Sequence, residues 1–243
     1  MQGKTHCLEV WGDFACFTRP EMKVERYSYP VITPSAARGI YDAIYWKKSH
    51  GFYWQIEKVE ILKPPRYIAL RRNEVKDKVP SISTVIAWRE GKRAIEPLWA
   101  DGDRDMLGTD QKGRTQRQTM ALKDVRYRLY AHMVFRNATS NVTAHDDQFV
   151  RRASQGKCFY QPYFGCREFP AFFKLVENDS AMGSAISYDA DLGWMLYDVF
   201  DLRQANDEFA APHISVFQTY VQQGVLSVPD YCDPIVRKAE GDI

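Results

Sequence analysis

The sequence lacks the motifs of several common enzyme classes. It has no glycine-rich phosphate loop of the Walker or Rossmann type, no His-Glu-x-x-His zinc motif and no Gly-x-Ser-x-Gly nucleophile motif. Nucleotide-driven motors, dinucleotide-dependent oxidoreductases, zinc peptidases and α/β-hydrolases are therefore not indicated.

Cysteines are few and long apolar runs are absent. The five cysteines form no Cys-x-x-Cys pair, so they indicate neither a disulfide framework nor a zinc site and are typical of buried side chains in a reducing cytosol. No apolar stretch approaches the roughly 18 residues of a membrane span, and charged residues from Lys4 onward interrupt any signal peptide. We expect a cytoplasmic chain without membrane contact.

Net charge is also small, +2 over 243 residues, but it is unevenly distributed. Residues 1–176 hold 30 Lys/Arg against 19 Asp/Glu, whereas residues 177–243 hold 3 against 12. A basic body favours a polyanionic partner, and an acidic C-terminal part favours docking onto a basic protein. Ordinary solubility explains the charge equally well. Aromatic residues, at 14%, suit either a large core or a surface that stacks on bases.

Hydrophobic periodicity predicts alternating strands and helices over the first 177 residues. Strands are expected at 5–17, 52–62, 67–72, 120–136 and 163–177, and helices at about 34–47 and 145–155. Thr33-Pro34 predicts a helix start, and Thr143-x-x-Asp146 has capping-box spacing. The order strand, helix, strand, strand, helix, strand indicates an α+β class with a ferredoxin-like (RRM-like) N-terminal domain over 1–177.

Two segments fall outside this repeating order. Residues 73–118 are irregular, with some order expected around 82–88, and they predict a long inserted arm, because structureless connections of this length are uncommon in compact domains. Residues 178–243 contain two β-like runs, at 192–200 and 214–221. We expect them to form a small C-terminal antiparallel β-sheet domain with an acidic surface.

Carboxylates are the first candidates for catalysis. The groups that could hold two metal ions are Asp146-Asp147 and the cluster Asp101, Asp103 and Asp105. The pair is expected in the first turn of a helix, where aspartate complements the helix dipole, and the cluster lies in a polar loop that would face water. Metal catalysis is therefore not favoured, and no metal site is predicted.

Metal-free cleavage of RNA needs fewer groups, because the nucleophile is the substrate's own 2′-hydroxyl. The protein supplies proton transfer, alignment and positive charge for the phosphate. Histidine suits proton transfer because its pKa lies near neutrality. Among the five histidines, His145 has the best context, at a predicted helix start followed by Arg151 and Arg152. A histidine at a helix start is, however, more often a solvated or capping residue.

Candidate RNA contacts gather near the end of the first predicted helix and around two arginine pairs. Tyr45 is followed by aromatic and basic residues, which either pack on the sheet and complement the helix dipole or meet an RNA backbone. A solvated face and a phosphate-binding face are both open for the arginines. The predicted RNA-binding residues are Arg38, Trp46, Lys47, Lys48, Arg71, Arg72, Arg151, Arg152, Lys157 and Arg167.

Several blocks resemble the Cas-five family of type I-C CRISPR systems. They lie, in order, at 11–47, 71–75, 120–136, 149–173 and 193–198. The resemblance spans nearly the whole chain. It implies a ferredoxin-like domain with a small C-terminal sheet domain. It also implies an endoribonuclease, without cofactor, that cleaves the repeat hairpin of precursor CRISPR RNA and leaves a cyclic phosphate and a 5′-hydroxyl.

The resemblance also implies site residues and partners. Tyr45 and His145 match the family's catalytic tyrosine and histidine, but Ala144 stands where the family has a lysine. The cations expected to replace that lysine are Lys47, Arg151 or Lys157. The implied partners are precursor RNA, the mature guide RNA whose 5′ handle the protein keeps, and the backbone and large subunits of the Cascade complex. Contact with double-stranded DNA is a further open expectation.

Three other functions stay open. The chain could be a binding-only subunit of the same complex, or an assembly protein whose basic face meets an acidic partner. It could also be a two-histidine phosphoesterase, although it has only one His-x-Ser motif, at 213–215. Cleavage of repeat RNA in EDTA and salt-sensitive RNA binding would distinguish these functions.

Overall fold

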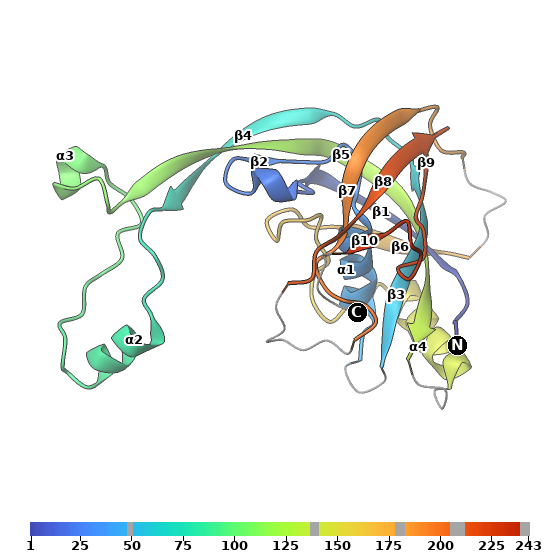
Figure 1. Cartoon of the computed structure of the whole chain (residues 1–243), viewed down its shortest axis with the longest axis horizontal. Coiled ribbons are helices and arrows are strands. Elements are labelled where there is room, and N and C mark those ends of the chain that lie inside the picture. Colours follow the sequence, from blue (N-terminus) through green and yellow to red (C-terminus); the bar gives the residue numbers. More distant parts are fainter. Residues whose placement is uncertain (48–50, 137–140, 178–182, 205–211, 239–243) are drawn as a thin grey trace. The chain divides into compact units, whose positions relative to one another are not determined.

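The computed structural model describes residues 1–47, 51–136, 141–177, 183–204 and 212–238 (Figure 1). The strands are β1 (His6–Ala15), β2 (Arg26–Tyr27), β3 (Phe52–Ile61), β4 (Tyr67–Val75), β5 (Arg114–Phe135), β6 (Phe172–Val176), β7 (Ala190–Asp198), β8 (Ser215–Gln222), β9 (Val225–Ser227) and β10 (Arg237–Lys238). The helices are the 3₁₀ turn η1 (Pro20–Met22), α1 (Pro34–Ile44), α2 (Ile82–Arg89), α3 (Arg104–Leu107) and α4 (Val142–Ser154). The protein is therefore α+β, as predicted.

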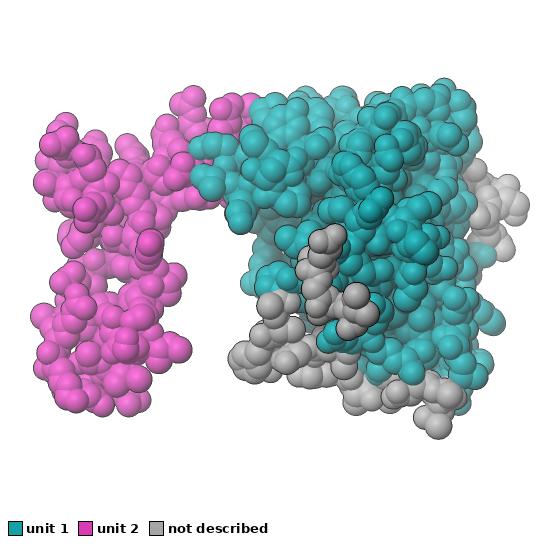
Figure 2. Space-filling model, in the orientation of Figure 1, with its two compact units in different colours: residues 1–68, 120–243 teal, residues 69–119 magenta. Residues whose placement is uncertain are grey.

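The chain divides into two compact units, coloured separately in Figure 2. The first contains Met1–Ile68 and Met120–Ile243, and the second contains Ala69–Thr119. The second unit overlaps the insertion predicted at 73–118, and α2 forms where some order was expected. Among the described helices, none combines the length and the apolar character needed to cross a bilayer.

The strands form one sheet with the order β10-β8-β9-β3-β5-β1-β6, and the pairings along this path are antiparallel. β2 and β4 also pair with β5, and β7 pairs with β8. The pairing of Val59 with Leu226 joins β3 to β9. The C-terminal strands, predicted as a small sheet of their own, therefore extend the main sheet, because β9 occupies the edge of β3. The boundary at 177/178 stays a prediction.

Helix α1 forms by the local signals in its sequence. Thr33 Oγ1 accepts a hydrogen bond from the Ala36 N–H at 3.3 Å, and Pro34 takes the first helical position. The helix ends before Tyr45, which has an extended backbone although its N–H still donates to the preceding turn. Its buried apolar face consists of Ala37, Ile40, Tyr41 and Ile44. This face packs on β3 and β7, and α1 also contacts α4.

Helix α4 begins three residues before its predicted start. The N-cap is Asn141, whose Oδ1 accepts a hydrogen bond from the Ala144 N–H at 3.2 Å. The predicted capping box of Thr143 and Asp146 is therefore wrong. The carboxylate of Asp146 lies 2.8 Å from His6 Nε2, so the helix is fastened to β1 by a contact that its own sequence does not reveal.

Candidate active site

Tyr45 and His145 are 100 residues apart in the sequence and in direct contact in the structure. Tyr45 Oη lies 2.8 Å from His145 Nδ1, which is hydrogen-bond distance. Tyr45 is the residue that ends α1, and His145 lies in the first turn of α4. Because α1 and α4 pack against each other, the ends of the two helices bring the phenol and the imidazole together.

The pair lies in an aromatic environment. Tyr45 is 2% exposed and His145 is 7% exposed. The ring of Phe52 lies 5.8 Å from the Tyr45 ring and 5.6 Å from the imidazole, and Phe135 lies 5.2 Å from the imidazole. Burial raises the pKa of the Tyr45 phenol, with the charge of Arg152 acting in the opposite direction. The phenol therefore stays protonated at neutral pH, and it can donate to Nδ1 when the imidazole proton is on Nε2.

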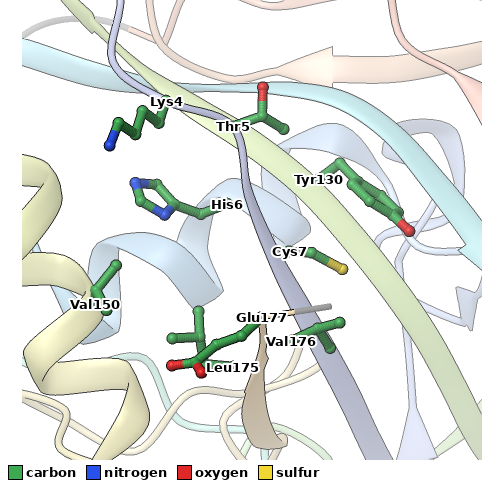
Figure 3. Close-up of a pocket in the computed structure, with 9 residues that line it drawn as sticks. All are labelled: Lys4, Thr5, His6, Cys7, Tyr130, Val150, Leu175, Val176 and Glu177. Carbon is green, nitrogen blue, oxygen red and sulfur yellow. The ribbon is translucent and has the colours of Figure 1, made fainter. Parts of the chain in front are cut away.

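A second buried pair fixes the helix that carries His145. His6 Nε2 lies 2.8 Å from Asp146 Oδ1, and the backbone N–H of Lys4 donates to Asp146 Oδ2 at 3.1 Å. Figure 3 shows His6 among the residues that line a pocket. The pocket has a volume of about 540 Å³ and is lined by residues 4–7 at the start of β1, by residues 175–177 at the end of β6, by Tyr130 of β5 and by Val150 of α4. Because Asp146 directly follows His145, these contacts hold the helical turn that carries His145. Sequence analysis assigned Asp146 to a capping box and missed this anchor, since nothing local connects residues 140 positions apart.

Arg38, predicted to bind RNA, is a buried ion-pair residue. It is 8% exposed, and its Nε and Nη2 donate to Asp198 at 2.7 and 3.1 Å. Its Nη1 donates to Asp42 at 2.5 Å. Two carboxylates thus engage the guanidinium, and its part in RNA binding stays a prediction. The prediction considered only the helix stripe that Arg38 shares with Tyr45, and Asp198 lies 160 residues away.

The other predicted RNA-binding residues differ in solvent exposure and lie in both compact units. Lys47, Arg151, Lys157 and Arg167 are exposed in the first unit, where Trp46 and Arg152 are half-buried. Arg71 and Arg72 lie on β4 in the second unit, and Arg72 Nη2 lies 2.6 Å from Glu74 Oε1. Lys48 lies outside the described residues.

Arg152 is the arginine whose charge acts on the Tyr45 phenol. Its Nε donates to the backbone oxygen of Ile44 at 2.7 Å, directly before Tyr45 in the chain. Its guanidinium carbon lies 4.0 Å from the ring centre of Phe159. Sequence analysis did not name Arg152 as a replacement for the family lysine. The available signal was its spacing from His145, because seven residues make two helical turns and place both on one side of α4.

The carboxylates considered for metal binding do not converge. Asp146 is engaged by His6, and Asp101 lies 3.3 Å from Arg114 in the second unit. Within the ranges that the structure describes, no three His, Cys, Asp or Glu side chains gather so that they could hold a metal ion. The candidate active site is therefore a set of proton-transfer groups with a nearby cation.

Comparison with known proteins decides the family. The family model of CRISPR-associated Cas5d proteins matches residues 5–229. The chain belongs to the Cas5d family. It is 42% identical over 238 residues to a protein of Mannheimia succiniciproducens named CRISPR pre-crRNA endoribonuclease Cas5d, covering 95% of this chain and 97% of the relative. A Thermus thermophilus protein of the same name is 37% identical over 193 residues, covering 79% of this chain and 72% of the relative.

The fold of this Cas5d chain also occurs in a solved structure. A protein described as a CRISPR-associated protein superposes with a TM-score of 0.62 at 19% identity, covering 98% of both chains. The resemblance inferred from sequence blocks is therefore confirmed at the level of family and α+β fold. These comparisons assign no role to an individual residue of the Cas5d chain, so the roles are proposed from the geometry of the site.

The contact between Tyr45 and His145 has the geometry of a short proton relay. The Tyr45 oxygen can accept a proton while its own proton passes to His145 Nδ1, and Nε2 can release a proton elsewhere. One pair can therefore serve as base and acid in the same step. The charge of Arg152 stands nearby to offset negative charge.

Proposed function

We propose that this Cas5d protein is an endoribonuclease that binds the repeat hairpin of precursor CRISPR RNA and cleaves it without metal. In the proposal it then stays on the 5′ handle of the guide RNA in the Cascade complex. Two relatives at 42% and 37% identity carry the name CRISPR pre-crRNA endoribonuclease. The observation that carries the catalytic part is the 2.8 Å contact between Tyr45 Oη and His145 Nδ1.

A ferredoxin-like core within residues 1–177 is part of the proposal. The strand order β6-β1-β5-β3, with α1 following β1 and α4 following β5, supports this assignment. Such a core places the ends of both helices on one side of the sheet. Residues 178–243 add their strands beyond β3.

The proposed reaction begins at the 2′-hydroxyl beside the scissile phosphate. This hydroxyl gives its proton to Tyr45 Oη while the phenolic proton moves to His145 Nδ1. The 2′-oxygen attacks phosphorus, and the bond from phosphorus to the 5′-oxygen breaks. His145 Nε2 gives its proton to the departing 5′-oxygen. The products are a 2′,3′-cyclic phosphate and a 5′-hydroxyl, and His145 ends as a neutral imidazole protonated on Nδ1.

In this scheme Arg152 supplies the positive charge that the family lysine would provide. The family lysine is replaced by Ala144, and Arg152 is the basic residue that acts electrostatically on the Tyr45 phenol. A fixed positive charge near the phosphate stabilises the crowded phosphorane, and one such group contributes on the order of 10²–10³ in rate. The exposed Lys47, Arg151 and Lys157 then serve mainly to bind the RNA backbone.

Burial sets a condition on this reaction. Because Tyr45 and His145 are 2% and 7% exposed, a phosphate cannot reach them without displacing the side chains that cover them. RNA that fits the surface must supply the binding energy for this displacement. Tyr45 and His145 therefore become accessible to a phosphate only when an RNA that fits the surface binds, which favours cleavage of that RNA over others.

A cleavage assay in EDTA tests the proposal. Wild-type protein should shorten the repeat hairpin and leave a cyclic phosphate, whereas His145→Ala should bind the same RNA without cutting it. His213→Ala is the control, because His213 follows β7 in the chain, far from this pair in sequence, and should leave cleavage unchanged. Cutting at full rate by His145→Ala would rule out the relay.

A binding-only subunit is the second candidate, favoured by one observation. Ala144 removes the cation that the family places beside the histidine. In that case wild-type protein would bind repeat RNA with strong salt dependence and give no product in EDTA.

The partners other than RNA are also proposals. We infer that the acidic residues 177–243 dock onto a basic backbone or large subunit, while DNA contact and a cytoplasmic location stay predictions. Assembly that survives replacement of exposed acidic residues such as Asp189 and Asp191 would count against this docking.

A further inference from the structure

A pocket of about 580 Å³ beside α1 has no part in the proposed cleavage chemistry. Its walls come from α1, from residues 159–163 and from residues 199–200, all in the first unit. The lining residues that matter here are Gly39, Asp42, Trp46, Phe159, Tyr160 and Phe200. They combine flat aromatic surfaces with one carboxylate, and the Arg38 guanidinium that pairs with it also lines the pocket.

We propose that this pocket binds one nucleobase of the RNA strand, and that Asp42 accepts a hydrogen bond from the amino group of that base. The inference rests on the proposed function, because it takes the occupant to be the RNA that Tyr45 and His145 cleave. It adds a specificity site that selects adenine, cytosine or guanine over uracil.

The aromatic side chains around the pocket are open to solvent. Phe159 is 58% exposed, Tyr160 is 52% exposed and Phe200 is 42% exposed. Every nucleobase has a flat face that can cover such rings by stacking, and single-stranded RNA is commonly held in this way. The Phe159 N–H donates to the backbone oxygen of Ala43 at 2.7 Å, so the loop that carries two of these rings is fixed to α1. The platform is formed before any ligand arrives.

Asp42 supplies the carboxylate among the residues that line the pocket. Its Oδ2 accepts from Arg38 Nη1 at 2.5 Å, whereas its buried Oδ1 has no hydrogen-bond partner among the residues the structure describes. A buried oxygen without a donor is unfavourable, and an amino group would satisfy it. Adenine, cytosine and guanine each carry an amino group, and carboxylates accept hydrogen bonds from such groups in nucleic-acid complexes. Uracil carries none.

The position of the pocket favours RNA over a protein partner. Asp42 and Trp46 lie three residues before and one residue after Tyr45, so the pocket is lined by the chain segment that carries the proposed catalytic phenol. A neighbouring hollow shares Tyr160 and extends to Arg167. An aromatic floor that continues to an exposed arginine matches alternating bases and phosphates.

Gly39 allows a test that keeps Asp42, Tyr45 and His145 in place. A Cβ added at Gly39 meets nothing within 4 Å, and the residue lies inside helix α1, where a side chain is favourable. Substitution by Ala, Leu and Phe therefore fills the pocket in steps. We expect repeat-RNA binding to weaken with side-chain size, by about tenfold for Gly39→Phe, as expected for one lost stacked base. Gln222→Phe adds the same ring to an exposed position on β8 and should leave binding unchanged.

Asp42→Asn tests which base is read. Its amide can present an N–H in place of the carboxylate oxygen, which turns an acceptor into a donor. Wild-type protein should bind single-stranded oligonucleotides of A or C about tenfold more tightly than U, and Asp42→Asn should lose or reverse this preference. An unchanged preference would overturn the assignment to Asp42.

The outcomes separate this inference from the proposed function. If wild-type protein cleaves repeat RNA in EDTA and Gly39→Phe binds it as tightly as wild type, the base pocket is refuted while the nuclease stands. If wild-type protein does not cleave but Gly39→Phe still weakens RNA binding, the pocket stands while the nuclease is refuted. If Gly39→Phe disrupts only assembly with other subunits, the occupant is a protein and the inference is overturned.

Discussion

The shared arginine in the core leads to a quantitative prediction about stability. Arg38 binds both Asp198 and Asp42, and Asp198 also accepts the backbone N–H groups of Val199 and Phe200 at 2.8 and 3.0 Å. One guanidinium thus serves two carboxylates, of which Asp42 is the less well satisfied. Burial raises the pKa of Asp42 from 3.8 to about 6, since the opposing charge of Arg38 is offset by that of Asp198.

An acid whose pKa is raised by folding makes the protein less stable once it ionises. The protonated acid contributes its full stability below about pH 3.8, and this contribution is lost as the pH rises through about 6. The shift corresponds to roughly 3 kcal/mol in total, of which about half falls between about pH 5 and about pH 7.5. Asp42→Asn cannot ionise, and its amide oxygen can still accept from Arg38. The free energy of unfolding of the variant should therefore rise by that amount relative to wild type between the two pH values.

Urea unfolding of both proteins at the two pH values measures this change. Asp201→Asn is a suitable control, because the hydrogen bond from Arg203 lowers the pKa of Asp201 to about 2. Its stabilisation is fully present well above the unfolded pKa of 3.8 and is lost as the pH falls from there through about 2, so its difference from wild type should stay constant between about pH 5 and about pH 7.5. A constant difference for Asp42→Asn as well would refute the reasoning.

Three further predictions concern the active site. Tyr45→Phe should reduce single-turnover cleavage in EDTA by about 10²-fold or more, because the relay loses its oxygen, while RNA binding persists. Arg152→Gln should slow cleavage by about 10²-fold and Arg151→Gln much less, and equal losses would contradict the role of Arg152. His6→Ala should lower the free energy of unfolding by about 1–3 kcal/mol, because buried Asp146 loses a partner. It should also lower kcat more than it raises KM, and loss of stability without loss of kcat would remove its positioning role.

Local signals in the sequence predicted the elements well. Thr33 and Pro34 mark the start of α1 because capping depends on neighbours three residues away. The strand expected at 120–136 forms within β5, since period-two patterns depend on backbone geometry. The C-terminal strands were expected to stand apart, because strand patterns do not encode which distant edge they join.

The site could be predicted only in part. Tyr45 and His145 came from the family resemblance, and the structure places their polar atoms 2.8 Å apart. The pairing of Arg38 with Asp198 could not be predicted from the sequence. Hydrophobic periodicity indicates which face of an element a residue occupies, but it does not indicate which distant residue it contacts. For the same reason the sequence suggested a surface arginine where the fold has a buried one.

The most direct test of the account is a double-mutant cycle on Tyr45 and His145. Single-turnover rates of repeat-RNA cleavage in EDTA would be measured for wild type, Tyr45→Phe, His145→Ala and the double variant. If the phenol and the imidazole form one relay, the double variant should be about as slow as the slower single variant. If the two losses multiply instead, the residues act independently, and the relay proposed from their contact is contradicted.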